Sequence, residues 1–429
     1  MDAAFIKKAQ NIVDYEVAHD PKVREVLQIV KEFIQSKRVL CYGGTAINNL
    51  LPKEDRIYDP NYDVPDYDFY SEKPQIHALE LADIFYSRGF RNIEVKPGAH
   101  LMTFKVFVDY TGIADITYLE TPIFKHLWDE EIIKGGIHYV SPNFLRMSMY
   151  LELSRPRGDV SRWEKVYKRL MLLNKHYPVG CKAHPEKGYA IVGDAERNGI
   201  EKLLVTKNIV LLGIHALDLH SKLRSNVWQT PIDVLADDMS EAINQFMNVL
   251  GEGVDVQERP AYAELLPAHV DILDKKGDLI VRVFKTFACH SYHLLQNGLR
   301  VASIPTLLQF FFAFVYADAH FIEGGYDQDR VICICQRLMD LAASTKRRFE
   351  LLTPLDCLGH QDTLTEIKKN KSDLFEKTPK KSNEFLRLFF AYKPGTLNKT
   401  QKNRIKTVLR KTSKATHDQD QDLVTDQTN

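Results

Sequence analysis

The stretch that most constrains the fold of this chain runs from residue 39 to residue 68. It opens with an apolar run of the length and composition of a buried strand, and the run ends in Gly43-Gly44-Thr45. Residues 46–51 then have the composition of a helix start. Glycines let a ligand approach the backbone closely, and the free N–H groups at a helix N-terminus attract anions. The stretch therefore predicts a phosphate-binding turn between a strand and a helix.

A pair of aspartates follows in the alternating run DYDFY. Asp66 and Asp68 share one face of the predicted strand, because successive side chains of a strand alternate between its faces. Two carboxylates this close repel each other unless a cation lies between them, which predicts a divalent-metal site. Each signal alone is weak, since a glycine pair is often only a turn and most such aspartates are solvated. Together in one unit they indicate nucleotide chemistry.

The spacing between the glycines and the aspartates leaves one alternative open. Residues 52–65 are rich in turn formers and predict an inserted loop, which adds the aspartates Asp59 and Asp63. Asp63 and Asp66 are three residues apart and would face opposite sides of a strand. We therefore prefer Asp66 and Asp68 as the metal-binding pair.

A third carboxylate is expected from a hairpin predicted over residues 101–119, in which Asp-Tyr-Thr-Gly forms the turn. Two-metal sites commonly take one acidic ligand from a neighbouring strand. Asp115 lies in an otherwise apolar strand, where a charge is costly without a partner. Asp109 is the alternative, but its place in the turn motif is sufficient to explain it. We expect Asp115 to complete the set.

The region after the hairpin is helical and basic. Arg162, Lys165 and Arg169 lie at positions i, i+3 and i+7 and share a helix face. Such a row suits the phosphates of a nucleotide or of RNA. A solvated helix face is an equally favoured alternative.

The second half of the chain looks like a degenerate copy of the first. Prolines and glycines gather in residues 175–199, which predicts a domain boundary there. Beyond it, Gly213 corresponds to Gly43 and Asp233 to Asp68, in the same order. By the same comparison, the strand after Asp278 matches the strand of residues 101–108.

The copy lacks two residues on which the predicted site depends. Ile214 stands in place of Gly44, and Pro231 stands in place of Asp66. A copy without the second glycine and the paired carboxylate cannot hold a triphosphate on two metal ions. We expect it to be catalytically inactive.

Composition limits the kinds of partner and cellular environment that the sequence allows. The formal net charge is zero, so nucleic-acid binding would depend on local patches. One patch is residues 393–414, with eight Lys/Arg and no acidic residue; RNA contact is the preferred interpretation and solubility the alternative. Six scattered cysteines predict reduced thiols. The most apolar run, residues 307–317, is too short to span a bilayer.

Five motifs together resemble the poly(A) polymerase catalytic subunits of poxviruses and other large cytoplasmic DNA viruses: YGGTAINNLLP, PDYDFYS, IADITYL, SPNFLRMSMYLELSRP and RWEKVYKRLMLLN. The resemblance covers residues 39–177. It implies a nucleotidyltransferase that adds adenylates from ATP to an mRNA 3′ end with two Mg²⁺ or Mn²⁺ ions. It implies Asp66, Asp68 and Asp115 as catalytic metal ligands. The implied nucleotide-binding residues are Gly43, Gly44, Thr45, Arg162, Lys165 and Arg169.

The resemblance also implies a fold class, domains, partners and a location. The fold class is α/β (α+β): a helical segment (1–37), a catalytic nucleotidyltransferase domain (38–177), a linker (178–200), a degenerate nucleotidyltransferase-like domain (201–392) and a disordered tail, basic then acidic (393–429). The implied partners are ATP and the mRNA 3′ end, with either a second copy of the chain or a methyltransferase-like processivity subunit, and no membrane. The implied location is the viral factory in the host cytoplasm and the virion.

Two other functions stay open. One is a nucleotidyltransferase with another acceptor or nucleotide, such as a terminal uridylyltransferase. The other is a non-catalytic RNA-binding scaffold subunit.

Overall fold

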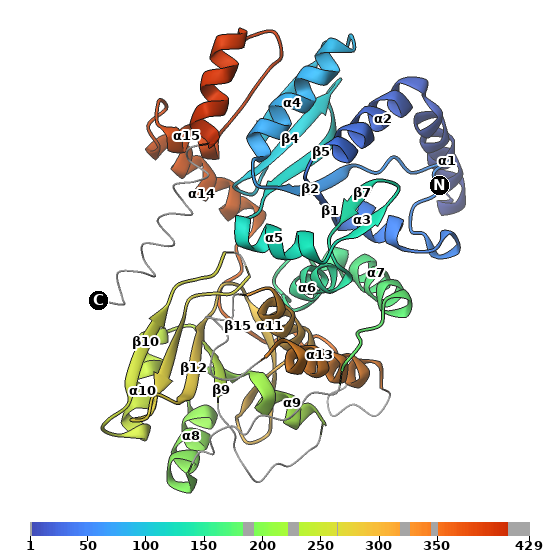
Figure 1. Cartoon of the computed structure of the whole chain (residues 1–429). Coiled ribbons are helices and arrows are strands. Elements are labelled where there is room, and N and C mark those ends of the chain that lie inside the picture. Colours follow the sequence, from blue (N-terminus) through green and yellow to red (C-terminus); the bar gives the residue numbers. More distant parts are fainter. Residues whose placement is uncertain are drawn as a thin grey trace. The chain divides into compact units, whose positions relative to one another are not determined.

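The computed structural model describes residues 2–182, 193–221, 231–263, 265–317, 327–344 and 351–410 (Figure 1). The chain divides into two compact units. One contains the described residues up to Ser141 together with those from Leu364 onward, and the other is Pro142–Thr363. Each unit is built around one mixed sheet.

The sheet of the first unit has seven strands in the order β3-β4-β5-β2-β1-β7-β6. They are β1 (Leu40–Tyr42), β2 (Tyr67–Ser71), β3 (Ile93–Pro97), β4 (Thr103–Val108), β5 (Thr111–Tyr118), β6 (Ile132–Lys134) and β7 (Ile137–Tyr139). The β5/β2 and β1/β7 pairs are parallel and the others antiparallel. In β4, Phe104, Val106 and Val108 are buried and alternate with less buried residues, so one face of this strand belongs to the core.

Helices cover this sheet and connect its strands. They are α1 (Ala3–His19), α2 (Pro21–Ser36), α3 (Gly43–Leu50), α4 (Pro74–Ser87), α5 (Thr121–Asp129), α14 (Leu364–Lys377) and α15 (Asn383–Leu388), with a short 3₁₀ turn at Lys53–Asp55. The predicted start of α2 is confirmed: the Asp20 carboxylate accepts the N–H of Lys22 at 2.7 Å, and Pro21 occupies the first turn. Helix α4 packs on β3, β4 and β5, which places its buried residues over the core.

The C-terminal segment, residues 391–410, is ordered against the first unit, which corrects the predicted disordered tail up to residue 410. Tyr392 exchanges backbone hydrogen bonds with Val95 and so covers the edge strand β3. Its hydroxyl donates to Asp83 of α4 at 2.5 Å, and burial together with this hydrogen bond raises the pKa of Tyr392 to about 12. Residues 411–429 lie outside the described residues.

Three lysines of the basic patch form ion pairs within the unit. Lys402 contacts Asp83 at 2.8 Å, Lys406 contacts Glu80 at 2.8 Å, and Lys393 pairs with Glu94. Two of the acidic partners lie on α4. The patch therefore fastens the C-terminal segment to the domain, and these three lysines are already engaged.

Lys402→Met is expected to lower stability and leave RNA affinity unchanged. A partly buried ion pair of this kind contributes about 1 kcal/mol, which corresponds to about 1 °C in melting temperature for a protein of this size. The matched control is Lys399→Met, because Lys399 is exposed on the same segment. Weaker RNA binding by Lys402→Met at an unchanged melting temperature would restore the original RNA-contact interpretation of this lysine.

The second unit repeats the strand order of the first and adds one strand: β10-β11-β12-β9-β8-β14-β13-β15. Its strands are β8 (Ile209–Leu211), β9 (Ile232–Ala236), β10 (Asp255–Arg259), β11 (His269–Leu273), β12 (Leu279–Lys285), β13 (His290–Leu294), β14 (Arg300–Ala302) and β15 (Cys357–Leu358). The parallel pairs are again the third and the fifth, β12/β9 and β8/β14. The predicted duplication of the fold is confirmed.

One detail of the predicted duplication is wrong. The strand that begins after Asp278 is β12, and its place in the sheet corresponds to β5. The sequence comparison instead matches it with the strand of residues 101–108, which contains β4. The true counterpart of β4 is β11. The error arose because adjacent antiparallel strands have similar apolar composition, so composition alone cannot fix which strand of a hairpin is matched.

Further helices of the described residues belong to the second unit. They are α6 (Pro142–Leu153), α7 (Trp163–His176), α8 (Asp194–Thr206), α9 (Gly213–Ser221), α10 (Met239–Leu250), α11 (Ile304–Tyr316) and α13 (Gln328–Ala343). Among the helices of the described residues, none is long and apolar enough to pass through a bilayer.

The compact units differ from the predicted domain boundaries. Helices α6 and α7 fall in the second unit, because α6 packs along α11: Tyr150 stacks on Phe312, with ring centroids 6.2 Å apart, and Phe144 meets the Tyr316 ring edge-on at 5.1 Å. Buried Arg146 ties α6 to α7 by donating to Asn174 at 2.8 Å. The predicted linker joins helices of one unit, and its residues 183–192 lie outside the described residues.

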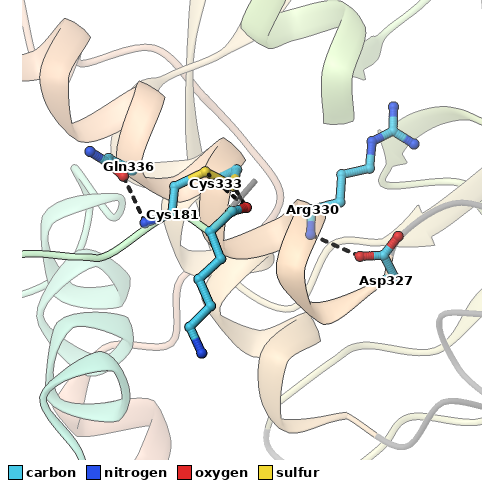
Figure 2. Close-up of a disulfide and its surroundings, with 6 residues drawn as sticks. Cys181, Asp327, Arg330, Cys333 and Gln336 are labelled. Carbon is cyan, nitrogen blue, oxygen red and sulfur yellow. Dashed lines mark hydrogen bonds between the residues drawn. A yellow bond between two sulfur atoms is a disulfide. The ribbon is translucent and has the colours of Figure 1, made fainter. Parts of the chain in front are cut away.

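The cysteines also depart from expectation. Cys181 is bonded to Cys333 of α13 and Cys289 to Cys357, whereas Cys41 and Cys335 are free and buried. Figure 2 shows the first disulfide together with the hydrogen bond from the N–H of Cys181 to Gln336, 2.9 Å long. The segment after α7 is thus fixed to α13. The prediction of reduced thiols is wrong for these four residues, because the scatter of cysteines in a sequence does not show which of them meet in the fold.

Candidate functional site

The candidate site starts at the turn between β1 and α3. Gly43 has a φ of +72°, and a Cβ built on it would lie 2.6 Å from Oδ2 of Asp68. Only glycine accepts both this backbone conformation and this close approach. The first N–H groups of α3 lack partners within the helix, as in any helix, and can face an anion. The carboxylate of Asp68 therefore lies directly beside the predicted phosphate-binding turn.

Strand pairing brings two of the three predicted carboxylates together. The parallel pair β2/β5 aligns Asp68 with Asp115. Aligned residues on adjacent strands project from the same face, about 5 Å apart. The antiparallel pair β4/β5 aligns Lys105 with Asp115 on the other side, and Lys105 Nζ contacts Asp115 Oδ2 at 2.5 Å. Lys105, Asp115 and Asp68 thus form one row across three strands, which we call the first charge row.

Asp66 lies immediately before β2 and is exposed. Its backbone carbonyl accepts a hydrogen bond of 2.6 Å from the Thr45 hydroxyl. Thr45 itself is buried, so its hydroxyl joins α3 to the aspartate motif. The observed contact makes Thr45 a residue that positions Asp66; a direct contact of Thr45 with a nucleotide stays a prediction.

The two rival aspartates have structural partners. The Asp63 carboxylate accepts the N–H of Asp59 at 2.7 Å within the predicted inserted loop. Asp109 lies in the hairpin turn with a φ of +47° and pairs with Lys22 of α2 at 2.5 Å. Each rival therefore stabilises a local turn or contact, in keeping with the preference for Asp66, Asp68 and Asp115.

The inserted loop is fastened next to the site by Asn48 of α3. Its Oδ1 accepts the N–H groups of both Ile57 and Tyr58 at 3.0 Å. Asn48 is buried, so this pair of hydrogen bonds fixes the path of the loop.

The negative charge of Asp68 affects the buried thiol of Cys41. Cys41 lies in β1 and is fully buried; burial, assisted by the negative charge of Asp68, raises the pKa of its thiol. The thiol therefore stays protonated and neutral, and adds no further negative charge beneath the aspartates.

Sequence reasoning missed Lys105. A regular hairpin that turns at residues 109–110 would align Lys105 with Ala114. The register shifts between Val106 and Phe107, and this β-bulge moves the alignment by one residue to Asp115. The alternation of the run TFKVFV predicts that Lys105 lies on the less buried face of its strand. No feature of the sequence predicts the bulge that aligns Lys105 with Asp115.

The three basic residues predicted to share a helix face, Arg162, Lys165 and Arg169, lie in the second unit. Arg162 ends the 3₁₀ turn Val160–Arg162, and its Nε contacts Glu152 Oε2 at 3.0 Å. Lys165 and Arg169 lie on α7. Both members of the Arg162 pair are partly exposed, so the pair stabilises little. A role for these three residues in nucleotide binding stays a prediction.

Comparison with protein families finds a match to part of the chain. Residues 28–159 match the family described as "Poly(A) polymerase catalytic subunit". A putative poly(A) polymerase catalytic subunit of Acanthamoeba polyphaga mimivirus is 34% identical over 160 residues, which are 36% of this chain and 27% of the relative. Its namesake in African swine fever virus (isolate Tick/Malawi/Lil 20-1/1983) is 30% identical over 180 residues, 41% of this chain and 38% of the relative. The matches thus span less than two fifths of either relative.

A comparison of folds extends further along the chain. The Megavirus polyadenylate synthase is similar with a TM-score of 0.77 over 95% of this chain and 88% of that structure, at 21% sequence identity. The α/β architecture with two related sheets is therefore that of a known fold.

Proposed function

Because residues 28–159 match the family described as "Poly(A) polymerase catalytic subunit", we propose that this chain is a template-independent adenylyltransferase that adds adenylates from ATP to the 3′ ends of viral mRNA. The observation that carries the proposal is the alignment of Asp68 with Asp115 beside the Gly43 turn. It joins an anion-binding backbone to a carboxylate pair, the combination that nucleotidyl transfer requires.

Two of the three predicted carboxylates, those of Asp68 and Asp115, are arranged as a divalent cation requires. Asp68 and Asp115 are adjacent in the sheet, and the missing Cβ at Gly43 keeps space beside Asp68 Oδ2. Carboxylate oxygens are the ligands that Mg²⁺ and Mn²⁺ prefer. Asp66, Asp68 and Asp115 would hold two such ions. When bound, the ions would supply charge stabilisation at the phosphates and lower the pKa of the attacking hydroxyl.

The chain's own residues would position the reactants. The backbone at Gly43 and Gly44 would hold the phosphates of ATP at the start of α3, and Thr45 would fix Asp66 through its carbonyl. The RNA 3′-hydroxyl would attack the α-phosphate in line, and pyrophosphate would leave. Catalysis of this kind depends mainly on positioning and charge, which hydrogen-bonded central strands of a sheet can provide.

We also propose the partners and the location that the family suggests. They are ATP, the mRNA 3′ end, and either a second copy of the chain or a methyltransferase-like processivity subunit, in the viral factory of the host cytoplasm and in the virion. Support comes from the similarity to proteins of two large DNA viruses. The second unit, with Pro231 and Ile214 in place of Asp66 and Gly44, would be inactive and would line the RNA path or an interface.

Incubation of the purified protein with Mn²⁺, an oligoribonucleotide primer and each nucleoside triphosphate separately tests the proposal. We expect extension with ATP alone. A primer that ends in a 3′-deoxynucleotide is the matched control and should not be extended. Extension with UTP would favour a terminal uridylyltransferase, and no extension with any nucleotide would favour a non-catalytic RNA-binding scaffold.

A further inference from the structure

The second sheet carries a charge row at the position that corresponds to the first. Strand pairing aligns Asp271 of β11 with Arg282 of β12, and Arg282 with Asp233 of β9. Arg282 Nε contacts Asp271 Oδ1 at 2.8 Å, and Arg259 of β10 reaches the other carboxylate oxygen at 3.5 Å. Arg282, Asp271 and Asp233 are all buried. We call Asp271, Arg282 and Asp233 the second charge row.

The two rows correspond strand by strand but differ in the order of charge. Lys105, Asp115 and Asp68 read cation, anion, anion from β4 through β5 to β2. Their counterparts on β11, β12 and β9 read anion, cation, anion. In the second row the cation is central and lies beside both carboxylates. In the first row it is at one end, so two carboxylates remain adjacent and repel each other.

From this difference we propose that Lys105 is a positioning residue of the metal site: it holds Asp115 beside Asp68 in the metal-free enzyme and competes with a divalent cation for the Asp115 carboxylate. The proposal deepens the proposed function and depends on it. Lys105 would thereby set how tightly the site binds its metal. The central arginine of the second row would stay paired with Asp271 and would lie beside Asp233, so that this row would balance its charges without a metal.

Exposure and side-chain chemistry favour an exchangeable role for Lys105. In the first row 38% of the Lys105 side chain and 19% of the Asp115 side chain are exposed, against 0% for Arg282 and 6% for Asp271. A lysine ammonium is a compact charge on a flexible stem, so it can withdraw into water when a cation arrives. A buried guanidinium held by a carboxylate cannot leave without a large desolvation cost.

The test measures Mn²⁺ binding to the full chain without ATP or RNA, by the loss of the electron paramagnetic resonance signal of free Mn²⁺. Lys105→Met should bind Mn²⁺ about tenfold more tightly than the wild type at low ionic strength, because a competing positive charge is removed. Lys105→Arg keeps the positive charge and should bind Mn²⁺ no more tightly than the wild type. The matched control is Lys96→Met: Lys96 aligns with Lys105 on the side away from Asp115, and its removal should change affinity less than about twofold.

Two outcomes would overturn the proposal, and they are distinguishable. If Asp115→Ala weakens Mn²⁺ binding but Lys105→Met leaves it unchanged or weaker, the proposed metal site stands and Lys105 has no competing role. If neither Asp115→Ala nor Asp68→Ala changes Mn²⁺ binding, the metal site of the proposed function fails, and the role of Lys105 fails with it.

Discussion

Asp68→Ala is expected to reduce adenylate addition by about a thousandfold or more while the protein stays folded. The change removes a ligand for both proposed metal ions, and several kcal/mol of transition-state stabilisation correspond to a loss of this size. It also removes one of two adjacent carboxylates, so the melting temperature of the metal-free protein should hold or rise. Primer extension with ATP and thermal unfolding without metal measure the two effects.

Asp63→Ala is the matched control for this prediction. Asp63 is acidic, lies five residues from Asp68 and accepts a hydrogen bond within an exposed loop. Its loss should leave activity within a few-fold of the wild type and cost little stability. Activity of Asp68→Ala near that of the wild type would contradict the assignment, and a severe loss in Asp63→Ala would make Asp63 a metal ligand instead.

The parts of the fold that the sequence predicted depend on local signals. Asp20-Pro21 determines the start of α2, because an acceptor side chain and a fixed φ suit the first helical turn whatever the rest of the chain does. Gly43 is predictable for the same reason: its positive φ and its approach to Asp68 exclude a side chain. The repeated order of strands was visible because equivalent turns, such as that at Gly213, keep their glycine.

The parts that the sequence did not predict depend on register and on distant contacts. A single bulge between Val106 and Phe107 decides that Lys105 faces Asp115, and bulges leave no clear mark in composition. The basic patch near the C-terminus looked like an RNA-binding tail because its acidic partners, Glu80 and Asp83, lie more than 300 positions away in the sequence. A run of like charges shows that a segment can bind the opposite charge, but it does not show whether the partner is RNA or another part of the chain.

Arg282→Met is expected to be among the most destabilising single changes in the second unit. It removes the central cation of the second charge row and leaves Asp271 and Asp233 in a dry environment with fewer compensating charges. Breaking a buried pair in this way costs about 3–5 kcal/mol, or about 3–5 °C in melting temperature for a chain of this length. Chemical denaturation and thermal unfolding measure the loss.

The matched change in the first unit is Lys105→Met, which breaks the corresponding pair where both side chains are partly exposed and should cost about 1 kcal/mol or less. Asp233→Ala completes the comparison. This change should at most lower the stability of the protein, and adenylate addition should remain intact at a temperature where the protein is folded. Loss of adenylate addition in folded Asp233→Ala would mean that the second sheet takes part in the chemistry. Retained addition, together with a large Arg282→Met penalty, would mean that the second charge row has a structural role and takes no part in the chemistry.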